Sequence, residues 1–135
     1  MKFPKDNAGK LIPGAMFADL GDLPRHLPNE SMNPEELVLL ALAELRKHAK
    51  EYLGISIIQA RAYTPPDNFF SPEFIKELAL AGISPVRARA VTSKHVTRLM
   101  LAMDVMETLL RKSEIVIFII IFVDIAYMSL ADRIR

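Results

Sequence analysis

One carboxylate interrupts the most apolar stretch of the chain. Asp124 follows the run at residues 115–123 and precedes a second apolar group that ends at Ala131. An ionisable side chain inside a bilayer persists only with a compensating partner, so a span here would make Asp124 an intramembrane polar contact with another subunit. In a soluble α/β fold the same residue would instead end a buried strand, where enzymes of that class place carboxylates.

A basic stretch supplies the second candidate chemistry. It resembles the hairpin of helix-hairpin-helix DNA-binding motifs, with Leu80, Gly82, Ile83, Pro85, Ala88 and Val91 at the matching positions. The resemblance implies a tight turn whose backbone N–H groups meet a phosphate. Nearby side chains would add positive charge toward a nucleic acid or toward anionic lipid headgroups, while a solvated corner between two helices is the structural alternative. The predicted contact residues are Gly82, Ser84, Arg87, Arg89, Lys94 and Arg98.

Other residue types give little support for catalysis or metal binding. His26, His48 and His95 lie in separate segments without carboxylates at ligand spacing, and the chain has no cysteine. Glycine-rich phosphate loops and the common nucleophile and zinc motifs are absent from the sequence. We therefore expect no cofactor, no metal site and a non-enzymatic role.

Two helix starts are clearly marked. Asn33 is a good N-cap, Pro34 suits the first helical position, and Gly54 is expected to end this amphipathic helix. Ser71 repeats the N-cap signal before a helix that runs to about residue 81. Residues 55–63 fit either a strand or a continuation of the first helix.

A third helix is predicted from residue 93 to residue 113. Its apolar side chains recur at alternating spacings of three and four, which is typical of a helix that packs along a narrow contact. If the same register continues, this helix and the following apolar run form one rod. We expect the stripe to contact another protein, and its members are Val96, Leu99, Met103, Met106 and Leu110.

The C-terminal apolar run has the composition of a membrane helix. Its aliphatic and Phe residues favour insertion by about −5 kcal/mol, and Asp124 opposes this by about 3 kcal/mol, so that insertion is narrowly favoured. Slightly more basic residues precede the run than follow it, which favours a cytoplasmic N-terminal body. The alternative is a buried strand in an α+β fold, which would require several partner strands and covering helices.

Together these patterns predict a mostly α-helical protein in three parts. Residues 1–33 read as an extended proline-rich arm, residues 34–113 as a small helical body, and residues 114–135 as a single transmembrane helix. Nearly balanced charge, 17 basic against 16 acidic residues, gives no general preference for polyanions. The expected function is that of an accessory or structural subunit in a membrane-associated assembly, with protein and lipid partners and with homo-oligomerisation left open.

Two other function classes remain open. A soluble nucleic-acid-binding module would use the turn at residues 80–91 and bury residues 115–123 in its core. A small α/β enzyme would place Asp124 at a strand end, and three or more parallel strands would support that fold.

Overall fold

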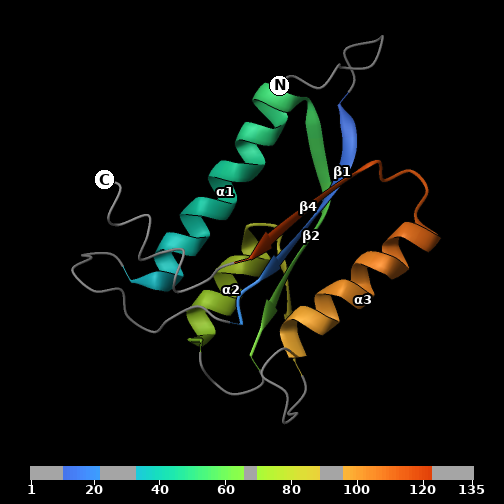
Figure 1. Cartoon of the computed structure of the whole chain (residues 1–135). Coiled ribbons are helices and arrows are strands. Elements are labelled where there is room, and N and C mark those ends of the chain that lie inside the picture. Colours follow the sequence, from blue (N-terminus) through green and yellow to red (C-terminus); the bar gives the residue numbers. More distant parts are fainter. Residues whose placement is uncertain (1–10, 22–32, 66–69, 89–95, 123–135) are drawn as a thin grey trace, which may run out of the picture.

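The chain forms an α/β fold around a four-stranded parallel sheet (Figure 1). The computed structural model describes residues 11–21, 33–65, 70–88 and 96–122. Strands and helices alternate within these ranges, and the sheet order is β3-β2-β1-β4. The elements are β1 (Ile12–Asp19), α1 (Pro34–Leu53), β2 (Ile55–Thr64), α2 (Pro72–Leu80), β3 (Ser84–Arg87), α3 (Val96–Arg111) and β4 (Ile117–Phe122).

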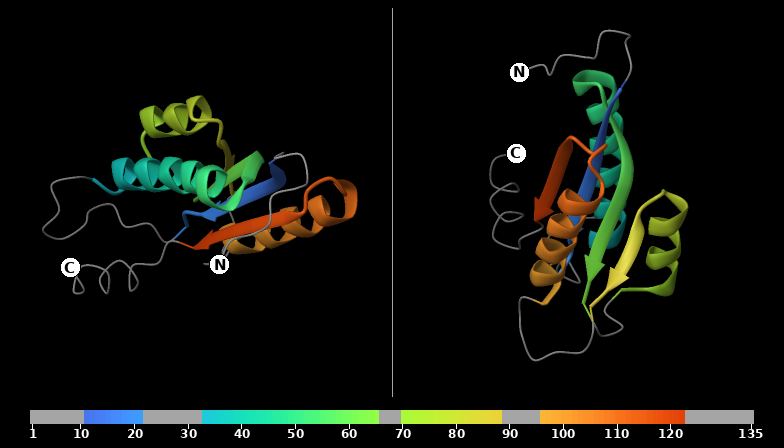
Figure 2. Two further views of the ribbon diagram at one scale, coloured as in Figure 1. Left: turned by 90° about the horizontal axis from the view of Figure 1, so that it is seen from above. Right: turned by 90° about the vertical axis from the view of Figure 1, so that its right-hand side faces the viewer.

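Helices cover both faces of this sheet. Figure 2 shows α1 and α2 on one face and α3 on the other. Parallel strands need this arrangement, because their connections cross over the sheet and bury both faces. The change of face coincides with the reversal of strand order, since β2 and β3 extend from one side of β1 and β4 lies on the other.

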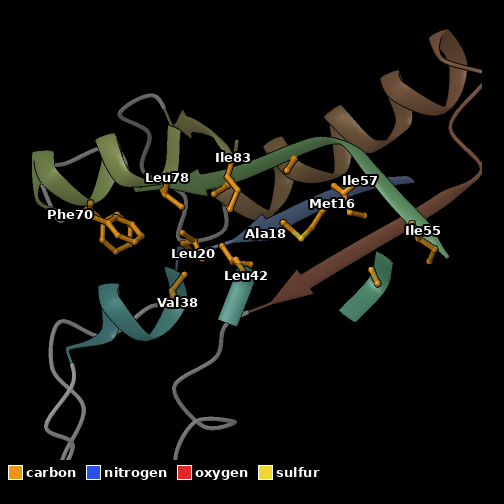
Figure 3. Close-up of a cluster of buried hydrophobic side chains, with 14 residues drawn as sticks. Met16, Ala18, Leu20, Val38, Leu42, Ile55, Ile57, Phe70, Leu78 and Ile83 are labelled. Atoms are coloured by element: carbon orange, nitrogen blue, oxygen red, sulfur yellow. The ribbon is translucent and has the colours of Figure 1, made fainter. Parts of the chain in front are cut away.

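β1 is the centre of the fold. Its residues 15–18 and the following Leu20 are fully buried. Alternate residues point to opposite faces: Met16 and Ala18 join the large core under α1 and α2 (Figure 3), whereas Phe17 packs toward α3 with Phe118 of β4. Gly14 lets the neighbouring strands approach closely, because a Cβ there would lie 2.7 Å from Ile55 Cγ2.

The helix starts predicted from the sequence are confirmed. The Asn33 side chain accepts a hydrogen bond from Glu36 N at 2.8 Å, and the Ser71 hydroxyl accepts one from Phe74 N at 3.2 Å. Gly54 ends α1 in the left-handed conformation, with φ of 68°, and this glycine lets the chain turn directly into β2. Residues 55–63 are therefore a strand and not a continuation of the helix.

The membrane helix predicted for residues 114–135 is wrong. Ile117–Phe122 forms β4, a strand that pairs with β1, and α3 ends at Arg111 instead of continuing as a rod. Within the described ranges no helix is both long enough and apolar enough to cross a bilayer. The prediction of a membrane protein with a cytoplasmic body thereby loses its basis. Ile, Val and Phe suit a strand covered on both faces as well as they suit lipid.

The mostly α-helical fold class is also wrong. The N-terminal segment was expected to be an arm, because Pro13 and Gly14 interrupt regular elements, yet it supplies the central strand. Likewise, the turn between two helices considered for residues 80–91 is followed by a strand, since Ser84–Arg87 forms β3. Pairing in the sheet thus joins segments that were predicted to be separate, namely the arm, the helical body and the C-terminal span.

Candidate functional site

The carboxyl edge of the sheet contains the candidate site. Strand order reverses between β1 and β4, with α3 crossing to the opposite face from α1 and α2 (Figures 1 and 2). In open α/β sheets ligands bind outside the carboxyl ends of the strands at such a reversal, because the connections diverge there and leave a crevice. The last residues of β1 and β4 and the first turn of α3 meet at this point.

Asp19 is the last residue of β1 and is only 4% exposed. Its Oδ1 accepts a hydrogen bond from the Gly21 backbone N–H at 2.9 Å, and its Oδ2 lies 3.6 Å from the Arg98 Nε. A buried carboxylate requires such partners, because removal from water strongly disfavours its charge. Asp19 therefore fixes both the turn after β1 and the position of the arginine.

Arg98 links the ends of β1 and β4. Its guanidinium carbon lies 5.2 Å from the centroid of the Phe122 ring, so the cation sits over the last residue of β4 while its Nε faces Asp19. The side chain is nevertheless 47% exposed. An arginine that is held by a carboxylate on one side and a ring on the other is oriented in advance to bind an anion from solvent.

The first turn of α3 lies directly against the turn after β1. A Cβ on Gly21 would collide with the Thr97 Oγ1, and Thr97 is buried. Glycine is therefore required here by the close approach of the two segments. This contact places the N-terminal end of α3, with its partial positive charge, beside Asp19 and Arg98.

The residues predicted to bind phosphate separate into two groups. Gly82 and Ser84 lie at the amino end of β3, where Arg46 of α1 donates hydrogen bonds to the carbonyls of Ala81 and Gly82. Arg87 ends β3, so it lies at the same carboxyl edge as Arg98. The structure thus divides the predicted set between opposite edges of the sheet, and Arg89 and Lys94 lie outside the described residues.

A second polar cluster lies between β2 and α3, and it was not predicted. The Oδ2 of Asp104 accepts a hydrogen bond from the Tyr63 hydroxyl at 2.7 Å and pairs with Arg61 Nη1 at 3.2 Å. Gln59 continues the row, because its amide donates to Thr108 Oγ1 and its oxygen accepts from Lys112 Nζ. Alternating polar residues at 59, 61 and 63 were the available signal. This row attaches α3 to the sheet.

The predicted helix-contact stripe lies on the outer side of α3. Leu99, Met103 and Met106 are each more than 60% exposed, and Leu110 is 84% exposed. Val96 begins the helix and is partly buried. Their exposure leaves the predicted protein contact open as a proposal.

Asp124 lies outside the described residues, two positions after the end of β4. Among the described residues there is no group of three or more His, Asp or Glu side chains that could hold a metal ion. The site at the carboxyl edge is thus described by Asp19, Gly21, Thr97, Arg98 and Phe122. No family model, curated protein or solved structure matches the chain, so a functional assignment depends on this geometry.

Proposed function

We propose that the protein binds the sugar-phosphate backbone of a nucleic acid across the carboxyl edge of its sheet. The observation that carries this proposal is the position of Arg98, which Asp19 and Phe122 hold at the reversal of strand order while nearly half of its side chain stays exposed. Guanidinium groups bind phosphate through paired N–H donors. Nucleic-acid recognition was one of the alternatives that the sequence left open.

Charge along the chain supports an anionic ligand. Between Glu77 and Asp104 there are four Lys or Arg residues and no acidic residue. This segment runs from α2 through β3 to the first turn of α3, so part of it connects the carboxyl end of β3 to Arg98. Arg87 ends β3, and Arg98 lies over Phe122 at the end of β4. These two strands are three strand spacings apart, or about 14 Å, which is enough for more than one phosphate. A polyanion therefore fits better than a single phosphate group.

The turn after β1 argues against a dinucleotide of the kind that classical doubly wound domains bind. Those domains place a glycine-rich turn and the N-terminus of the next helix directly after the first strand. Here one glycine, Gly21, follows β1, and α1 begins only at Pro34. Side chains, and not a backbone cradle, would therefore contact phosphate.

Binding is proposed in preference to catalysis because of the state of Asp19. Both of its oxygens already have partners, Gly21 N–H on Oδ1 and Arg98 on Oδ2. A general base must come within hydrogen-bond reach of the substrate proton, and Asp19 is only 4% exposed. The arrangement suits a carboxylate that positions an arginine.

The test measures binding of labelled single-stranded RNA and DNA by fluorescence anisotropy between about 50 and 200 mM salt. Wild type should bind more weakly as salt rises, with a slope of about −0.7 for each phosphate that is neutralised. Arg98→Gln should weaken binding roughly tenfold and reduce the slope by about 0.7, since it removes one phosphate contact. Comparison of the two oligonucleotides and a duplex identifies the preferred form.

Arg111→Gln is the matched control. Arg111 is also an arginine of α3, but it lies at the opposite end of the helix, where it pairs with Glu107 and is 77% exposed. This variant should bind like wild type, and thermal unfolding should show that both variants remain folded. Equal binding by wild type and Arg98→Gln, or no binding at low salt, would refute the proposal.

A further inference from the structure

The outer side of α3 has an unusual composition for an exposed helix surface. We define the α3 stripe as Leu99, Met103, Met106 and Leu110, which are 61%, 62%, 63% and 84% exposed. A helix on the surface of a globular protein normally directs its polar residues to solvent and its apolar residues to the core. A continuous row of exposed Leu and Met is typical of a protein contact.

The inner side of α3, which faces the sheet, includes polar residues. Leu101 is buried there, but Asp104 and Thr108 also face the sheet, where they bind Tyr63 and Gln59. Polar side chains are thus satisfied inside while four large apolar ones point outward. The helix carries two apolar or mixed surfaces, and the sheet covers only one of them.

The α3 stripe is symmetric about its own midpoint. Read in either direction, it runs Leu, Met, Met, Leu at spacings of four, three and four residues. A helix rises about 1.5 Å per residue, so the stripe extends about 16 Å. Two antiparallel copies related by a two-fold axis would therefore place Leu99 opposite Leu110 and Met103 opposite Met106.

We propose that the occupant of this surface is a second copy of the chain, which packs its α3 antiparallel across a two-fold axis. A two-fold interface requires a surface that is complementary to itself, and the stripe satisfies this requirement in residue type and in spacing. Leu109 widens the surface, because it is 57% exposed and comes close to Ala102 of the other copy in this register. Methionine side chains adapt readily to one another at such a contact.

β4 also carries exposed apolar side chains. Ile120 and Phe122 of β4 are 44% and 50% exposed, and they share one face of the strand with Phe118, which packs toward α3. They therefore lie on the α3 side of the sheet. No charged side chain lies within the α3 stripe, so pairing two copies would not bury a charge there.

Disulfide cross-linking can test both the partner and the orientation, because the chain contains no cysteine. Leu99→Cys and Leu110→Cys are made as separate proteins, one with a mass tag, and are oxidised alone and as an equal mixture. An antiparallel pair should give the mixed disulfide only, since identical positions are about 16 Å apart and a disulfide needs Cα atoms within about 7 Å. Disulfides between identical positions, or no disulfide, would overturn the proposal.

Sedimentation over a wide dilution series provides the second measurement, which does not depend on cysteine chemistry. Wild type should be a dimer that dissociates on dilution, and Met103→Lys should weaken the dimer roughly a hundredfold by placing charges in an apolar contact. Leu40→Lys is the control, because Leu40 is 53% exposed on α1, on the opposite face of the sheet. A wild-type monomer at every concentration would overturn the proposal.

Discussion

Asp104 connects α3 to β2 through a single carboxylate oxygen. That oxygen accepts from the hydroxyl of Tyr63, which is fully buried, and from Arg61. Burial, together with the hydrogen bond to the Asp104 carboxylate, raises the pKa of the Tyr63 hydroxyl well above its ordinary value. Tyr63 therefore keeps its proton, and continues to donate to Asp104, even at a pH near the ordinary tyrosine pKa of 10.0.

Tyr63→Phe should lower the free energy of unfolding by about 1–2 kcal/mol, because it removes a hydrogen bond to a charged acceptor. The effect should also depend on pH. Above about pH 10 an unfolded tyrosine loses its proton while native Tyr63 retains it, so wild-type stability should fall as the pH rises. Urea unfolding at neutral and alkaline pH should show a smaller fall in the variant.

Tyr52→Phe is the control for this comparison, since Tyr52 is 61% exposed on α1. It should leave both the stability at neutral pH and the alkaline fall unchanged. If Tyr63→Phe and wild type lose stability equally above pH 10, the hydroxyl of Tyr63 is not held as described.

At the scale of elements, β1 depends on small side chains at its entry into the sheet. A Cβ on Gly14 would lie 2.7 Å from Ile55 Cγ2 and 3.3 Å from the Ile117 carbonyl oxygen. The pairing of β1 with β2 also shifts register between Gly14 and Ala15. The strands on both sides of β1 therefore contact this residue, and a shift of β2 or β4 to admit a larger side chain would disturb the pairing of the sheet.

Gly14→Ala should destabilise the fold by about 1–3 kcal/mol, the usual cost of overpacking a core position. The measurement is the midpoint and slope of urea unfolding. Ala43→Gly, on an exposed position of α1, tests the sensitivity of the assay because glycine inside a helix costs about 1 kcal/mol. Unchanged stability of Gly14→Ala would mean that β2 can shift to admit the methyl group.

The helices could be predicted from the sequence because their signals are local. Asn33, Ser71 and Gly54 each act on backbone groups within a few residues, and all three do so in the structure. Strands β1 and β4 could not be assigned in the same way. A short run of Ile and Phe has no period that separates a buried strand from a buried or membrane helix. Only its pairing with β1, about a hundred residues earlier, decides the matter.

The candidate site was partly predictable for the same reason. The basic stretch containing Arg87 and Arg98 was selected as a phosphate-binding region, and both residues lie at the carboxyl edge. Asp19 was missed, because its role depends on β1 being the strand next to the reversal of strand order. Locally, it is one acidic residue in a segment with several prolines and glycines.

At the scale of the whole molecule, β1 holds the sheet together, with β2 on one side and β4 on the other. The β4 side chains complete both cores: Ile117, Ile119 and Ile121 pack on the α1 and α2 side, and Phe118 stacks on Phe17 at 6.2 Å. Each large apolar side chain that is buried contributes about 1.5–3 kcal/mol. The four β4 side chains are partly buried, so each contributes part of this amount, which is still a large share of the total stability of a domain, about 5–15 kcal/mol.

A chain that ends at Ser113 should therefore fail to fold. It would lack β4, leave Phe17 and one edge of β1 uncovered, and lose the cooperative thermal transition while binding a hydrophobic dye. A membrane-anchored helical body would behave in the opposite way, since removal of its anchor should leave a well-folded fragment. Far-UV circular dichroism on heating distinguishes the two results. Ile120→Thr in the full chain, at a position that is 44% exposed, should retain the transition and shows that loss of the strand, rather than of one apolar side chain, is decisive.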